Sequence, residues 1–161
     1  MKIIRTYLAA FLKPEIAAKQ LENIKMYKTM LIVSLVVAFV GAIYDKVVEG
    51  IIGGVVAIAF VAFMSIIHVF FAKALRVSTK YKSVYNVNAL YFVLMLLFFN
   101  FFISFKASVI IYIVAISICI YLVYVFAVVF SKMHNITVKK AVVVNVITTL
   151  LTINTVLLLI I

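Results

Sequence analysis

The residues that can do chemistry in this chain are few, and they lie inside apolar segments. A histidine such as His68 can carry a proton or bind a metal ion, but no second histidine or carboxylate stands at a ligand spacing from it. His68 shares one helical stripe with Gly54, Ala57 and Ser65, and small side chains let a neighbouring helix approach closely. We therefore interpret His68 as a packed histidine at a helix interface, with a metal or proton role as the alternative.

A second polar stripe follows the last apolar segment. Asn145, Thr148 and Thr152 recur there at spacings of three and four residues, between Ala141 and Thr155. Amides and hydroxyls inside apolar helices usually form hydrogen bonds to adjacent helices, which is the interpretation that we favour. The alternative is that the stripe lines a path for a substrate.

No arrangement of residues typical of catalysis is present in the sequence. Asp45 and Glu49 stand in a short polar connection without a nucleophile, and Asn100 is an isolated amide in an apolar run. The sequence has no glycine-rich phosphate loop, Ser/His/Asp pattern or metal motif. No charged residue falls in the middle of an apolar run, where proton-coupled transport and intramembrane proteolysis usually need one. We expect a protein that is not an enzyme and has no cofactor.

The composition decides what kind of elements carry these residues. Of the 161 residues, 69% are hydrophobic and 12% are charged, whereas soluble domains have about 45–50% apolar and about 25% charged residues. A soluble fold of this size cannot bury so much apolar surface, so the sequence predicts an integral membrane protein. The net charge of +11 does not indicate nucleic-acid binding, because the basic residues lie between apolar runs and not on one soluble patch.

Five apolar runs predict five transmembrane helices. Each run is close to the ~20 residues that a spanning helix needs, and none alternates as the strands of a barrel would. The sequence therefore predicts an all-α membrane domain over residues 29–161. Its spans are about 29–44, 51–72, 87–105, 107–130 and 141–161, and Ser104, Lys106 and Ser108 make the break between the third and fourth.

Residues 1–28 form a separate interfacial segment in this prediction. The apolar residues of 1–13 recur at helical spacings and the basic ones fall on the opposite face, so we expect an amphipathic helix in the plane of the lipid headgroups. Pro14 breaks this helix and opens a second one. The second helix is expected to turn Ile16, Leu21 and Ile24 inward.

The basic residues predict the orientation. All of the 15 lysines and arginines except Lys46 and Lys106 precede the first run or lie in the second-to-third and fourth-to-fifth connections. By the positive-inside rule, the N-terminus is cytoplasmic and the C-terminus is extracytoplasmic. We also expect a basic collar that attracts anionic headgroups, the alternative being that these charges only fix the topology. The collar residues are Lys2, Arg5, Lys13, Lys80 and Lys82.

Several short motifs resemble the Yip family, membrane proteins first described as partners of Ypt/Rab GTPases. Pro14-Glu15 resembles the proline before the first span of that family, and residues 68–73 resemble the end of its second span. Residues 78–83 are similar to the loop that follows, and residues 133–141 are similar to the entry of the fifth span. Arg76-Val77-Ser78 replaces a glycine pair common in the family, and the chain is most similar to its short prokaryotic members.

The resemblance implies a non-enzymatic protein that organises membranes or recruits partners in membrane trafficking through its N-terminal helices. Its expected partners are membrane lipids with anionic headgroups, and other membrane proteins or a second copy are further candidates. The alternatives are a small transporter or lipid-transfer subunit that uses the polar stripe of the last span, and a structural subunit of a larger membrane complex.

Overall fold

The computed structural model describes residues 2–103 and 109–160, with the side chains of residues 5–98, 100, 113–152 and 154. These residues form seven helices and no strand, so the predicted all-α class is confirmed for this part of the chain. The helices are α1 (Lys2–Leu12), α2 (Pro14–Asn23), α3 (Met26–Ile43), α4 (Val47–Ala74), α5 (Tyr81–Ile103), α6 (Val109–His134) and α7 (Val138–Ile160).

Helices α3 to α7 take up the five apolar runs in order. Several of them extend beyond the predicted run, as α5 does by starting at Tyr81 and α6 by continuing to His134. The start of α5 is helical because Val84, Tyr85 and Asn86 are buried against the rest of the bundle, and such packing outweighs the weak helix propensity of these residues. Among the described residues, α3, α4 and the Ile113–His134 part of α6 are long and apolar enough to cross a membrane. The predicted break at residues 104–108 lies outside the described part.

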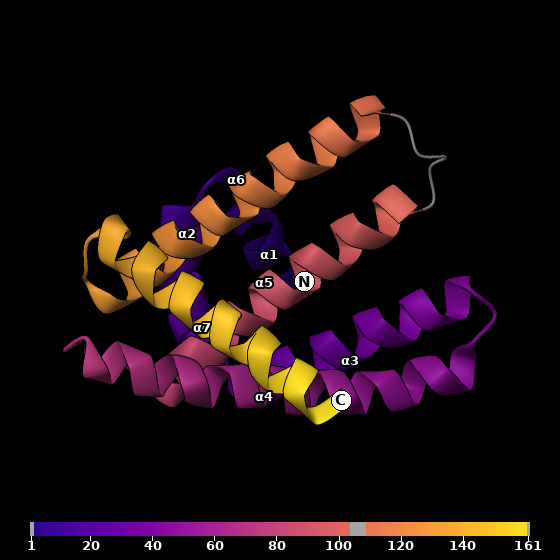
Figure 1. The fold of residues 1–161 in the computed structure, drawn as a ribbon, viewed down its shortest axis with the longest axis horizontal. Helices are drawn as coiled ribbons and strands as arrows, with labels where there is room; N and C mark the ends of the chain where they lie inside the picture. Colours follow the sequence, from indigo (N-terminus) through magenta and orange to yellow (C-terminus); the bar gives the residue numbers. More distant parts are fainter. Residues whose placement is uncertain (1, 104–108, 161) are drawn as a thin grey trace.

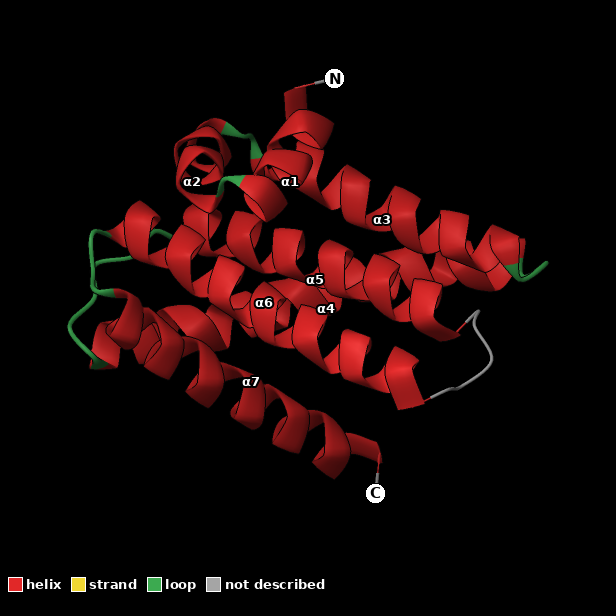
Figure 2. Ribbon diagram, turned by 90° about the horizontal axis from the view of Figure 1, so that it is seen from above, coloured by secondary structure: helices red, strands yellow, loops and turns green. Residues whose placement is uncertain are grey.

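The long helices form two antiparallel hairpins, α3–α4 and α5–α6, and α7 crosses α4 and α6 (Figure 1). Viewed from above, α7 and the α1–α2 pair lie on opposite sides of the layer that contains α4, α5 and α6 (Figure 2). The connections at residues 75–80 and 135–137 lie at one end of the bundle. We call it the lysine-rich end, because the lysines in or beside these connections are Lys73, Lys80, Lys82, Lys132, Lys139 and Lys140. Left-handed residues reverse the chain after three of the helices, with φ values of 55° at Asp45, 57° at Arg76 and 51° at Asn135.

Glycines bring α3 and α4 into close backbone contact. A Cβ atom placed on Gly41 would lie 2.5 Å from the Gly50 Cα, and one placed on Gly54 would lie 3.0 Å from the Ser34 carbonyl oxygen. Both distances are below ordinary contact, so a larger residue cannot be added without moving a helix. Gly50 and Gly54 therefore act as a small-residue seam of the kind that packs membrane helices.

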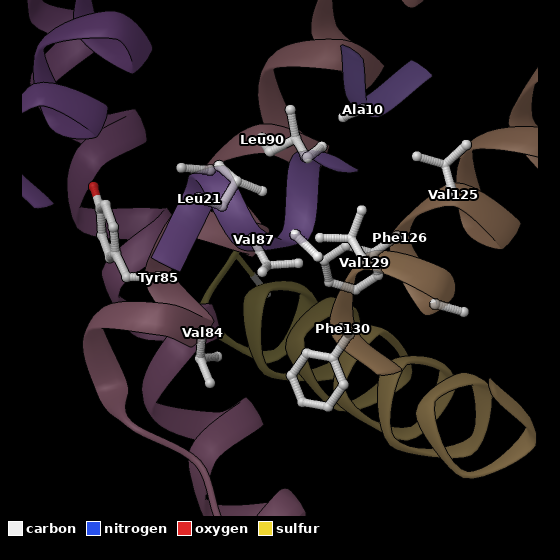
Figure 3. Close-up of a cluster of buried hydrophobic side chains, with 14 of the residues drawn as sticks. Ala10, Leu21, Val84, Tyr85, Val87, Leu90, Val125, Phe126, Val129 and Phe130 are labelled. Carbon is white, nitrogen blue, oxygen red and sulfur yellow. The ribbon is translucent and has the colours of Figure 1, made fainter. Parts of the chain in front are cut away.

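The buried core includes residues of all seven helices, and one part of it lies where α1, α2, α5 and α6 meet. Figure 3 shows side chains from all four helices converging there. Helix α1 buries Tyr7 and Ala10 there, and α2 buries Ala17, Ala18 and Leu21. The labelled core residues are Ala10, Leu21, Val84, Tyr85, Val87, Leu90, Val125, Phe126, Val129 and Phe130.

The α1–α2 pair is docked on the bundle, with one face of each helix against it. Tyr7 is 6% exposed, and burial raises the pKa of its hydroxyl. The expectation for α2 was partly wrong, because Ile16 is 50% exposed while Ala17 and Ala18 face the bundle. Small alanines allow α2 to pack closely on α6, and this rotates Ile16 outward. Leu21 is buried as expected.

Candidate functional site

A layer of polar side chains crosses the bundle near the lysine-rich end. It contains Ser65 and His68 of α4, Asn88 of α5 and Asn145 of α7, each at most 4% exposed. His68, Asn88 and Asn145 lie about two turns, or about 10 Å, from the ends of their helices at the lysine-rich end. One residue from each stripe expected from the sequence, His68 and Asn145, is thus buried at a similar distance from that end. We call these four residues the polar layer.

Three members of the polar layer share a hydrogen-bond chain. His68 Nδ1 lies 3.2 Å from Asn88 Oδ1, the Asn88 amide nitrogen donates to Ser65 Oγ at 3.0 Å, and Ser65 Oγ donates to the Val61 carbonyl at 2.6 Å. Because Asn88 Oδ1 can only accept, His68 carries its proton on Nδ1. Its Nε2 is then a buried acceptor, and it has no hydrogen-bond partner among the described residues.

Aromatic rings hold the His68 ring in place. Phe130 of α6 stacks on it with a centroid distance of 4.5 Å and an interplanar angle of 24°, and Phe130 also lies 4.4 Å from the His134 ring. Phe126 meets the edge of the His68 ring at 5.9 Å. The histidine is therefore held on two sides by aromatic packing and on a third by Asn88.

The α7 side of the polar layer is less completely satisfied. Thr152 donates to the Thr148 carbonyl at 2.8 Å, but Thr148 Oγ1 and both polar atoms of Asn145 have no hydrogen-bond partner in the described part. Asn145 lines a cavity of about 160 Å³ together with Tyr91 and Phe126. The cavity is large enough for several water molecules or one small polar molecule. No group of three or more metal-binding side chains occurs among the described residues.

Asn86 forms a second polar centre, which the sequence interpretation missed. Its Nδ2 donates to the carbonyls of Leu21 and Ile24, both at 3.0 Å, and its Oδ1 accepts from Thr29 Oγ1 at 2.8 Å. The side chain is fully buried. It therefore fixes the corner where α2 passes into α3. The sequence did contain an indication of this site, because two amides, Asn86 and Asn88, stand at the start of an apolar run. An amide buried there without a hydrogen-bond partner would be costly.

The residues of the predicted basic collar do not lie together in the structure. Arg5 lines a pocket of about 630 Å³ together with Lys25 and Lys28, which the collar did not include. Lys13, beside Pro14 at the α1–α2 junction, and Lys80 and Lys82 at the start of α5 are exposed, and none of them lines that pocket. The side chain of Lys2 lies outside the described part.

The other predicted packing residues are separate from the polar layer. Asn100 donates to the Leu96 carbonyl of its own helix at 2.8 Å. Gly54 is buried against Ser34 of α3. Both positions are explained by local packing, and neither joins the His68 or Asn145 sites.

No protein-family model, curated protein or solved structure matches this chain. Its function is therefore inferred from the geometry of the chain itself.

Proposed function

We propose that the chain is a non-enzymatic, multi-pass membrane protein of the Yip type that organises one leaflet of the membrane and recruits partners there. The observation that carries this proposal is the α1–α2 pair, which is fastened to the side of the bundle yet keeps apolar side chains exposed. Leu8, Leu12 and Ile16 are 63%, 75% and 50% exposed. In water this surface would be unfavourable, whereas at a bilayer interface it is buried in lipid.

The bundle exterior supports embedding in a bilayer. On α3, Leu31, Leu35 and Phe39 form an exposed stripe at helical spacing, and Ile51, Ile52, Val55 and Val56 do the same on α4. The four residues of the polar layer lie inside the bundle, each at most 4% exposed. In the proposal, α5 and α7 join α3, α4 and α6 as spans, and the lysine-rich end is cytoplasmic according to the positive-inside rule.

Docking the α1–α2 pair at one depth gives the molecule different cross-sections in the two leaflets. In the proposed orientation the cytoplasmic leaflet accommodates the five spans and the extra pair, whereas the other leaflet accommodates the spans alone. Lipids must rearrange around this wedge, and curved membranes accommodate it best. This asymmetry is a physical means of sensing or shaping a membrane without catalysis.

The wedge can be tested by reconstituting the full chain into liposomes and measuring vesicle diameter and shape by electron cryomicroscopy. We expect deformation that grows with the ratio of protein to lipid, and a clear decrease in the variant Leu8→Gln/Leu12→Gln/Ile16→Gln. The control is Val47→Gln/Val48→Gln, which changes exposed apolar residues at the opposite end of the bundle. Unchanged vesicle shape with the native chain would refute the wedge.

The second candidate is a small transporter or lipid-transfer subunit that uses the polar layer. The unpartnered amide of Asn145 beside its cavity favours it, because a buried amide without partners is costly unless a ligand or water satisfies it. The variant Asn145→Leu separates the two functions. A transporter loses its flux in this variant, whereas the wedge keeps its effect on vesicle shape.

A further inference from the structure

We infer that the pocket between α1, α2 and the start of α3 binds the phosphate of one anionic phospholipid, and that an acyl chain of the same lipid lies in an apolar groove on the other flank of α1. The inference rests on the proposed function, because it requires the α1–α2 pair to lie in a leaflet. It goes further by naming a discrete site and its ligand class in place of a diffuse collar.

The charges of the pocket select an anion. Arg5, Lys25 and Lys28 line it, and no Asp or Glu is among its lining residues. The nearest acidic residue in sequence, Glu22, is not among them. The ion pair that the described residues form, Glu15 with Lys132 at 3.3 Å, also lies elsewhere. Three cations are therefore left to neutralise a phosphate.

Neutral donors complement the three cations. The Gln20 side-chain oxygen accepts from Thr6 Oγ1 at 2.8 Å, so the Gln20 amide group is left to donate at the pocket wall. Helix α3 starts after Lys25, and no side chain caps its N-terminus. The backbone N–H groups of its first turn and the positive end of its dipole thus lie beside Lys25 and Lys28, an arrangement that favours an anion.

The pocket is organised before any ligand binds. Asn86 holds the Leu21 and Ile24 carbonyls and thereby fixes the α2–α3 corner that carries Lys25. The Thr6–Gln20 hydrogen bond joins α1 to α2 across the pocket. The protein therefore loses little conformational entropy when a lipid binds. A rigid site of this kind favours specific binding over diffuse electrostatic attraction.

The apolar groove makes a lipid a better occupant than a free phosphate. It measures about 550 Å³, and Leu8 and Leu12 of α1 line it together with Leu94, Leu97 and Phe98 of α5. Phe11 stacks on Phe98 with a centroid distance of 5.5 Å and forms part of the groove wall. Because Arg5 and Thr6 precede Leu8 on the same helix, the headgroup pocket and the groove flank one short segment, which suits a molecule with a charged head and an apolar tail.

Native mass spectrometry of the full chain in an uncharged detergent tests the site. The probes are dioleoyl phosphatidylglycerol, dioleoyl phosphatidylcholine and inorganic phosphate. We expect one phosphatidylglycerol to be retained in preference to phosphatidylcholine. Retention should fall by about tenfold or more in Arg5→Gln/Lys25→Gln/Lys28→Gln. The matched control Lys13→Gln/Lys19→Gln/Lys139→Gln removes the same charge outside the pocket and should retain the lipid.

Two further measurements make the result decisive. The variant Lys25→Arg/Lys28→Arg keeps the charges and should retain phosphatidylglycerol, which separates loss of binding from loss of folding. Equal retention by the pocket and control triple variants would overturn the site, and so would competition by inorganic phosphate as effective as that by the lipid. Vesicle deformation by the pocket triple variant reports the wedge independently, so failure of the lipid site is distinguishable from failure of the proposed function.

Discussion

At the scale of single residues, the His68–Asn88 pair is the clearest test of how the polar layer is held together. Replacing Asn88 with Leu removes the partner of His68 Nδ1 and leaves a buried donor unpaired, which should lower the free energy of unfolding by about 1–2 kcal/mol. The double variant His68→Phe/Asn88→Leu removes both polar partners and should recover most of this loss. Thermal unfolding in detergent, arranged as a double-mutant cycle, measures the coupling, and strictly additive losses would contradict it.

The same residues show what a sequence reveals at this scale. The periodicity of small and polar residues predicted that His68 on one helix, and Asn145, Thr148 and Thr152 on another, face neighbouring helices, and all four are buried. Their partners were not predictable, because Asn88 lies on a different helix and Asn86 contacts residues 57 to 65 positions away. Pairing across such distances depends on which helices become neighbours, and a helical stripe carries no information about that.

At the scale of helices, the α3–α4 seam makes opposite predictions for two glycines of one helix. A Cβ on Gly50 would lie 3.0 Å from the Gly41 Cα and 3.1 Å from the Ala38 carbonyl oxygen, both of which are backbone atoms. The variant Gly50→Ala should therefore destabilise the protein by about 1–3 kcal/mol.

Gly53 is the matched control, because a Cβ there would meet only the end of the Val37 side chain, at 3.3 Å. The variant Gly53→Ala should be neutral or slightly stabilising, since alanine is the better helix former. Thermal unfolding of both variants checks the pair. Equal destabilisation would mean that helix propensity, and not the seam, determines the effect.

Helix existence was predictable and helix docking was not. The apolar runs marked α3 to α7, and Pro14 marked the break between α1 and α2. We expected α1 and α2 to lie flat among the headgroups, and did not predict their contacts with α5 and α6. On α2 these contacts depend on the buried residues Ala17, Ala18 and Leu21. Alanine contributes weakly to an amphipathic pattern, yet its small size is what permits close packing. The grouping of Arg5 with Lys25 and Lys28 follows from that docking and so could not be predicted either.

At the scale of the whole molecule, the proposed five-span topology makes a definite prediction. Reporter fusions in the connections at residues 75–80 and 135–137 should be cytoplasmic, and fusions at residues 44–46 and at the C-terminus should be extracytoplasmic. The variant Lys2→Gln/Arg5→Gln/Lys13→Gln should keep this topology, because most of the basic residues at that end remain. A cytoplasmic C-terminus would exclude an odd number of spans and with it the five-span proposal.

The docking of the α1–α2 pair has a consequence for how the protein is made. The Tyr121 hydroxyl donates to the Phe11 carbonyl, two residues 110 positions apart, and Glu15 pairs with Lys132. Tyr121 and Lys132 belong to α6, which is synthesised after α1 to α5. Among the described helices, α1 and α2 leave the ribosome first. The pair therefore cannot complete its docking until α6 has been made. Because α5 is made earlier and offers partners through Asn86 and Phe98, the pair can dock in two stages, first on α5 and then on α6.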